Sequence, residues 1–140
     1  MQKRHFLHAT ALAMAALASG HAGAQDNEFK IGFILPMTGP QASTGHQIEA
    51  GAKLFLAEHG DTVAGRKVEM IVKDDTSLPD VNKRLAQQLI VSDQVNVLAG
   101  FGITPAALAT APLATQSKTP MVIMSAATSI ITEASPYIVR

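Results

Sequence analysis

Short apolar runs alternate along the chain with longer stretches in which apolar residues recur every three or four positions. The short runs, typical of strands buried on both faces, are at 30–35, 68–72, 96–99, 120–124 and 137–139. The longer stretches predict helices over 46–59 and 106–117, with a further helix between them that begins near Pro79. This alternation predicts right-handed β-α-β crossovers and therefore an α/β fold with a doubly wound parallel sheet.

Local signals refine the predicted helices and turns. Thr76 or Ser77 is expected to cap the second helix. Thr104, which precedes a proline, is expected to cap the third helix. Pro112 is expected to kink or interrupt the third helix, because proline removes a backbone donor. Residues 61–65 are expected to form a simple turn between a helix and a strand.

The first 24 residues have the three parts of a secretory signal peptide. Lys3 and Arg4 precede an apolar stretch, 6–17, which is shorter than the about 20 residues that span a bilayer. Small residues at positions 22 and 24 predict cleavage after Ala24 and export to the periplasm. Only the chain beyond this segment is expected to fold into the mature protein.

Composition excludes several classes of function. Hydrophobic residues make up 47% of the chain, which is too many for a disordered segment. Eleven Lys and Arg balance eleven Asp and Glu, so the clustered positive charge needed to bind nucleic acid is missing. The chain contains no cysteine, which excludes disulfides and thiolate metal sites.

Three predicted loops follow the carboxyl ends of strands, where open parallel sheets bind their ligands. These loops, 36–45, 100–104 and 125–129, are rich in glycine, serine, threonine and alanine and poor in charge. Thr104 is the most specific candidate, because its hydroxyl and the free amides of a helix start suit a carboxylate. The alternative is that Thr104 only caps the helix.

None of the motifs expected for nucleotide binding or catalysis is complete. Five residues rather than four separate Gly39 from Gly45, and histidine rather than lysine follows, so this is not a P-loop. Residues 100–102 supply only the first half of a dinucleotide-binding fingerprint. Asp74 and Asp75 are neighbours on a strand and point to opposite faces, which argues against a shared metal site. We therefore predict no enzyme, no cofactor and no bound metal.

The motifs on this framework occur in an order found in one protein family. They are Ile31-Gly32, Pro36 to Pro40, Gly45, Gly51-Ala52, Gly65, Asp74-Asp75, Val95 to Gly100, Thr104 and Met124 to Thr128. In order and spacing the chain resembles the leucine/isoleucine/valine-type solute-binding proteins of ABC importers, which have the type I periplasmic binding-protein fold. The resemblance covers residues 29–140.

The resemblance implies a protein of two α/β lobes that close over a ligand. Residues 25–140 would be the first lobe, incomplete and truncated at about the fifth strand, with no helix to cover that strand. The implied function is a periplasmic substrate-binding component that captures a small carboxylate, either an amino acid or an aromatic or keto acid. The implied partner is an ABC permease in the inner membrane, and the complete protein would be a monomer. A ligand-sensing receptor module of the same fold is the alternative.

The resemblance also assigns site residues. Thr104 falls where a hydroxyl holds the ligand's carboxylate, Ala126 where backbone groups bind it, and Thr128 where a further hydroxyl is supplied. Thr44 falls where branched-chain amino-acid binders often carry an aromatic residue, so more room is left for the ligand's side group. Residues 100–105 resemble a branch whose members include binders of aromatic and keto acids.

Overall fold

The computed structural model describes residues 27–140, so the predicted signal peptide lies outside the described residues. In chain order the elements are β1 (Glu28–Leu35), α1 (Ala42–His59), β2 (Thr62–Val63), β3 (Arg66–Asp74), α2 (Pro79–Val91), β4 (Val97–Gly100), α3 (Thr104–Ser117), β5 (Met121–Ile123), α4 (Ile130–Glu133) and β6 (Ile138–Val139). Strands and helices alternate as the hydrophobic pattern predicts, and the α/β class is confirmed.

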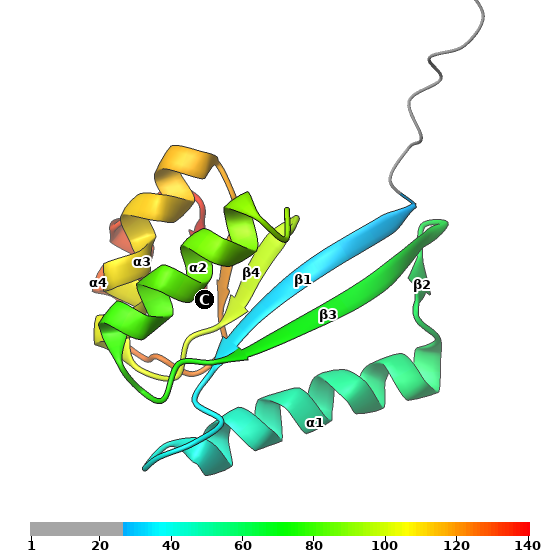
Figure 1. Cartoon of the computed structure of the whole chain (residues 1–140), viewed down its shortest axis with the longest axis horizontal. Coiled ribbons are helices and arrows are strands. Elements are labelled where there is room, and N and C mark those ends of the chain that lie inside the picture. Colours follow the sequence, from blue (N-terminus) through cyan, green and yellow to red (C-terminus); the bar gives the residue numbers. More distant parts are fainter. Residues whose placement is uncertain (1–26) are drawn as a thin grey trace, which may run out of the picture.

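One sheet with the strand order β2-β3-β1-β4-β5-β6 organises the fold (Figure 1). All neighbouring pairs from β3 to β6 are parallel, and only the edge pair β2–β3 is antiparallel among the described strands. At the carboxyl edge the register aligns Leu35 with Asp74, Ile34 with Gly100, and Gly100 with Ile123. The carboxyl ends of β3, β1, β4 and β5 therefore lie next to one another.

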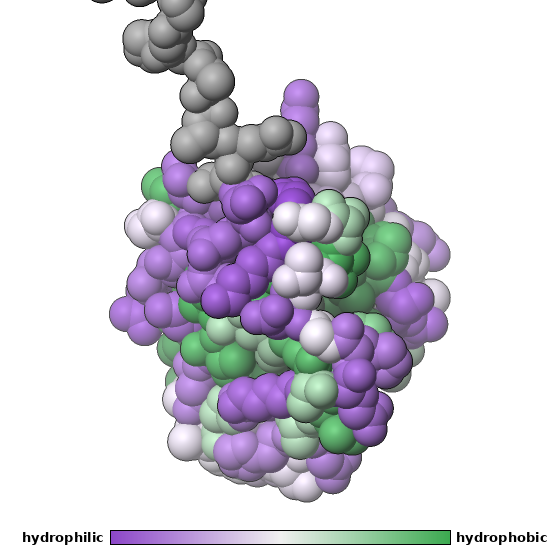
Figure 2. Space-filling view, turned by 90° about the vertical axis from the view of Figure 1, so that its right-hand side faces the viewer, coloured by the Kyte–Doolittle hydropathy of each residue, from purple (hydrophilic) through white to green (hydrophobic). Residues whose placement is uncertain are grey.

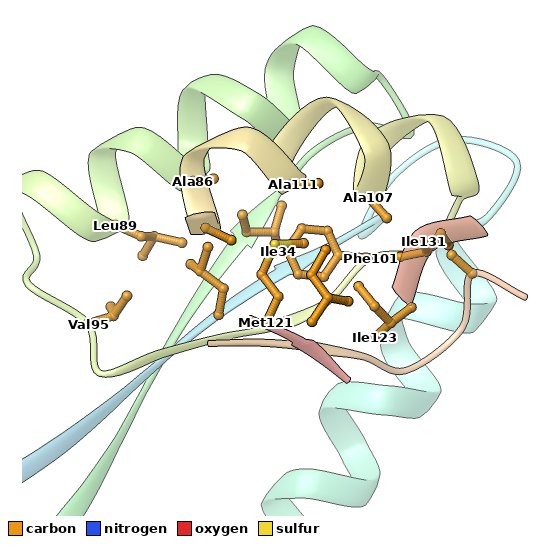
Figure 3. Packing of buried hydrophobic residues seen from close by; sticks show 14 residues of the cluster. Ile34, Ala86, Leu89, Val95, Phe101, Ala107, Ala111, Met121, Ile123 and Ile131 are labelled. Atoms are coloured by element: carbon orange, nitrogen blue, oxygen red, sulfur yellow. The ribbon is translucent and has the colours of Figure 1, made fainter. Parts of the chain in front are cut away.

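Helices cover both faces of the sheet, which is the doubly wound arrangement. On one face α2 and α3 enclose the larger core cluster, in which Ile34, Leu98, Phe101 and Met121 are almost completely buried (Figures 1 and 3). Alanines line α3 where it meets α2 and the sheet, so the two helices pack closely. This cluster holds the carboxyl ends of β1 and β4 together from one side.

The opposite face carries α1 and a smaller cluster. Ile48 and Ala52 of α1 pack there against Phe33 and Leu35 of β1. Beyond the reach of α1, Val122 of β5 and Val139 of β6 remain exposed on the sheet. Seen from the side of β2, the surface is largely hydrophilic, with hydrophobic patches between polar residues (Figure 2).

Several predicted boundaries are wrong. The first helix begins at Ala42 rather than at residue 46, so the end of the expected 36–45 loop is helical. Residues 61–65 form a hairpin rather than a simple turn, because Ala64 and Gly65, at φ of 51° and 78°, connect β2 to β3. The short helix α4 was not predicted, because four residues are too few to show a periodic pattern.

The predicted helix caps are also wrong. Thr76 and Ser77 precede α2 but have φ of 52° and 61°, and Leu78 occupies the N-cap position without a side-chain hydrogen bond. Ile103 takes the N-cap position of α3, and Thr104 is the first helical residue.

The expected interruption at Pro112 does not occur, because α3 continues through this residue. Pro112 is exposed, so water can reach the backbone carbonyl that has no amide donor opposite the proline. No helix within residues 27–140 is both long enough and apolar enough to cross a membrane.

Candidate ligand-binding site

The point where the chain changes direction lies between β1 and β4. The connection after β1 leads to α1 on one face of the sheet, whereas the connection after β4 leads to α3 on the other face (Figure 1). The two strands are hydrogen-bonded neighbours, so their outgoing loops diverge at the carboxyl edge. Open α/β sheets bind ligands in the crevice outside such a point, and all three loops expected from the sequence follow strands that end at this edge.

The loop after β1 contacts both the first turn of α1 and the loop after β4. A side chain at Gly45 would meet the Pro36 carbonyl oxygen at 2.2 Å, so only glycine allows α1 to approach this closely. A side chain at Gly102 would meet the Pro36 ring at 2.7 Å. Pro36 is fully buried between these two glycines. Thr44 and Thr104, each close in sequence to one of the glycines, are thereby anchored to the same proline.

Backbone hydrogen bonds join the loop after β4 to the loop after β5. The Met124 amide donates to the Gly100 carbonyl at 2.8 Å, and the Ala126 amide donates to the Phe101 carbonyl at 3.0 Å. The Ser125 hydroxyl lies 3.4 Å from the Gly102 carbonyl, to which it donates. These contacts fix the segment that carries Ala126 against the segment that leads into α3.

Two adjacent residues at the centre of the crevice have positive φ. Gly100 has φ of 111° and Phe101 has φ of 66°, although phenylalanine rarely adopts that conformation. The Phe101 side chain is fully buried in the core, and its amide donates to the Ile34 carbonyl at 3.0 Å. Packing and hydrogen bonding therefore compensate for the backbone strain and turn the chain sharply towards α3.

The four residues assigned from the sequence all lie on these joined segments. Thr104 is half-buried at the start of α3, and Thr44 is half-buried in the first turn of α1. Ala126 is buried, and because its amide is committed to Phe101, its carbonyl oxygen is the backbone group it can offer to a ligand. The Thr128 carbonyl accepts from the Ile131 amide at 3.4 Å, which places this residue at the entrance to α4.

Sequence reasoning missed part of the lining of this edge. A hollow of about 390 Å³ lies at the carboxyl end of β5 and is lined by Ile123, Met124, Ser125, Ala126, Ala127 and Arg140. Arg140 brings positive charge beside loops that have none of their own. Its position directly after the last predicted strand was the available signal, since that places it at the same sheet edge.

β3 ends at Asp74, and the carboxylates of Asp74 and Asp75 bind different parts of the structure. Burial raises the pKa of Asp74, but hydrogen bonds from the Thr38 hydroxyl and three backbone amides outweigh this and hold the pKa below its ordinary value. The Asp75 carboxylate is fully buried and accepts from the Ser77 amide and, at 2.8 Å, from the Asn82 side chain.

The buried network continues from Asp75 into α3. The Asn82 side-chain oxygen accepts from the Thr110 hydroxyl at 2.8 Å, and both residues are fully buried. The end of β3 is thereby connected to α2 and α3 on one side of the sheet. Within residues 27–140, no group of three or more His, Cys, Asp and Glu side chains is placed to hold a metal ion.

Three loops are thus joined at the switch point between β1 and β4. The sequence profile of the periplasmic binding protein family matches residues 28–140. The chain belongs to this family. Leu/Ile/Val-binding protein homolog 6 of Brucella abortus (strain 2308) is 44% identical over 132 residues, which cover 94% of this chain and 33% of that relative. The chain thus spans about a third of the length of this relative.

Solved structures of ABC-transporter solute-binding proteins share the fold. One from Rhodopseudomonas palustris BisB5, in complex with 3,4-dihydroxybenzoic acid, is 68% identical with a TM-score of 0.81, covering 81% of this chain and 31% of that chain. Another from R. palustris, in complex with 4-hydroxybenzoate, is 47% identical with a TM-score of 0.78, and it also covers 81% of this chain and 31% of that chain. LivJ of Streptococcus pneumoniae, in complex with isoleucine, is 25% identical with a TM-score of 0.74, covering 79% of this chain and 32% of that chain. These relatives are solute-binding proteins and not enzymes.

Proposed function

We propose that the full-length protein is a periplasmic receptor that binds a hydroxylated benzoate and delivers it to an ABC permease of the inner membrane. The observation that carries this proposal is the 68% identity to a solute-binding protein in complex with 3,4-dihydroxybenzoic acid. Identity falls to 25% for the relative in complex with isoleucine. Export would depend on the signal peptide proposed for residues 1–24, and the mature protein would act as a monomer.

The chemistry of the crevice supports an aromatic acid. The loops 36–45, 100–104 and 125–129 contain no charged residue, so these three loops offer no carboxylate to an ammonium group. Arg140, in contrast, lines the hollow beside Ser125 and Ala126, so the charge at this edge of the sheet favours an anionic ligand. A threonine at position 44, half-buried in the first turn of α1, leaves space for an aromatic ring.

Each site residue then has a proposed role. The Thr104 hydroxyl and the free amides in the first turn of α3 hold the carboxylate, because a helix start favours negative charge. The Ala126 carbonyl oxygen and an ionised carboxylate are both hydrogen-bond acceptors, so they cannot pair with each other. The Ala126 carbonyl therefore pairs with a ligand hydroxyl. Thr128 supplies a further hydroxyl, and Thr44 forms part of the wall.

A thermal-shift screen of the complete mature protein tests the proposed function. Isoleucine, 4-hydroxybenzoate and 3,4-dihydroxybenzoate are compared at equal concentrations. A ligand present at 100 times its dissociation constant stabilises the folded state by about 2.7 kcal/mol, which raises the melting temperature by several degrees. We expect this shift with the benzoates. A shift with isoleucine alone would contradict the proposal.

Removing the Thr104 hydroxyl is expected to weaken benzoate binding. Thr104→Val preserves the shape of the side chain but removes the donor, which costs roughly 1–3 kcal/mol of binding free energy. Thr62→Val, on the exposed edge strand β2, is the matched control and should bind normally. Isothermal titration of both variants measures the effect. Equal affinity for Thr104→Val and the wild type would leave Thr104 with a packing role only.

A further inference from the structure

We propose that Asp74 is a positioning residue of the ligand site, which holds the loop after β1 in the shape that brings α1 and Thr44 to the crevice. The role rests on the proposed function, because it concerns the same site. Asp74 does not belong to the uncharged loops that line the crevice, and it acts on the ligand through the loop it binds.

The carboxylate of Asp74 binds the loop after β1 at three points. Its Oδ1 accepts from the amides of Met37 at 2.9 Å and Thr38 at 3.3 Å, and its Oδ2 accepts from the Thr38 hydroxyl at 2.6 Å. A fourth hydrogen bond, from the Thr76 amide at 2.8 Å, fixes the carboxylate to its own turn. Hydrogen bonds to an ionised carboxylate are stronger than neutral ones.

The loop that Asp74 holds leads directly to the crevice. The Gly39 carbonyl accepts from the Ala42 amide at 3.2 Å, which starts α1 two residues before Thr44. Met37 packs against the first turn of α1, since its sulfur would lie 3.2 Å from a side chain placed at Gly45. Movement at residues 37 and 38 would therefore shift the start of α1.

The Asp74 carboxylate is bound by the loop after β1 and by its own turn. Neither of the ion pairs found within residues 27–140 includes Asp74, and its pKa is lowered by hydrogen bonds from the loop and the turn rather than by a cation. Because both oxygens of the Asp74 carboxylate accept from backbone amides or the Thr38 hydroxyl, the carboxylate fixes the loop in a single geometry. A surface ion pair would tolerate more than one geometry.

The test compares Thr38→Val with Thr38→Ser in the complete mature protein, with 4-hydroxybenzoate as the probe. Thr38 is exposed, so we expect melting temperatures without ligand to stay close to that of the wild type. The loss of one charge-assisted hydrogen bond is expected to weaken binding by about fivefold to tenfold in Thr38→Val. Thr38→Ser retains the donor and should bind within about twofold of the wild type.

A double-variant comparison separates positioning from direct contact. Asp74→Asn should weaken binding at least as much as Thr38→Val, and the two changes together should cost no more than Asp74→Asn alone, since both remove one interaction. Asp80→Asn, in the exposed first turn of α2, is the control and should bind normally.

The outcomes are distinguishable. If Thr38→Val and Asp74→Asn both bind 4-hydroxybenzoate as tightly as the wild type does, the positioning role is overturned and the proposed function stays intact. Losses that multiply in the double variant would overturn it as well, because Thr38 would then act on the ligand independently. A wild-type protein that binds none of the benzoates would overturn the proposed function and this role with it.

Discussion

Replacing Gly100 by alanine is expected to destabilise the protein by about 3 kcal/mol or more. Two causes act together. A side chain at this position would lie 2.4 Å from the Ile34 carbonyl oxygen, and Gly100 has φ of 111°, which L-residues rarely adopt. The clash is with the backbone of β1, the central strand, so it cannot be relieved by rotating a side chain. Urea denaturation of the complete protein measures the loss.

Gly51→Ala is the matched control for this prediction. Gly51 lies within α1, and a side chain there would meet nothing within 4 Å. Alanine is favoured over glycine inside a helix by about 1 kcal/mol, so this variant should be slightly more stable than the wild type. Equal stability of Gly100→Ala and Gly51→Ala would contradict the close packing of β4 against β1.

Replacing Asn82 by alanine is expected to have the second largest effect, a loss of about 3 kcal/mol of stability. The substitution removes the donor to Asp75 and the acceptor for Thr110 at once. Both partners are completely buried, so Asp75 Oδ2 and the Thr110 hydroxyl would each lose a hydrogen-bond partner in the core, although the Ser77 amide would still donate to Asp75 Oδ1. The carboxylate oxygen is the more costly of the two groups to leave without its partner.

Lys83→Ala provides the control for this substitution. Lys83 is the next residue of α2 but is exposed, so its truncation should change stability by no more than about 0.5 kcal/mol. The two variants are compared by their urea midpoints. A midpoint for Asn82→Ala within the range of the control would show that the buried network contributes little, and that α2 and α3 are held by apolar packing alone.

The alternation of elements could be predicted because it depends on local patterns. The runs around Ile34, Met70, Leu98 and Met121 are apolar since these strands are covered on one or both faces. Boundaries were harder to predict where glycine or threonine occurs in a helix. Residues 42–45 looked like loop because Thr44 and Gly45 are weak helix formers, whereas in the fold Gly45 is needed for the close approach to Pro36.

The meeting of the three candidate loops at one edge was also predictable, since the carboxyl ends of parallel strands share an edge. What local sequence could not show are contacts between distant residues. Thr38 and Asp74 are 36 positions apart, and Asn82 and Thr110 are 28 apart. The cap assignments for Thr76 and Ser77 were wrong for a local reason, because the amides of these residues donate to the carboxylates of Asp74 and Asp75, two positions earlier.

The central claim is that the joined loops form a seat for a carboxylate. Binding of 4-hydroxybenzoate and of its neutral analogue 4-hydroxybenzamide to the complete mature protein, measured by isothermal titration at neutral pH, tests this claim most directly. The two ligands have nearly the same shape, but only the acid carries the charge. Since hydrogen bonds to a charged group contribute about 1.5–3 kcal/mol each, we expect the acid to bind about 100-fold more tightly. Equal affinities would contradict a carboxylate seat at this edge of the sheet.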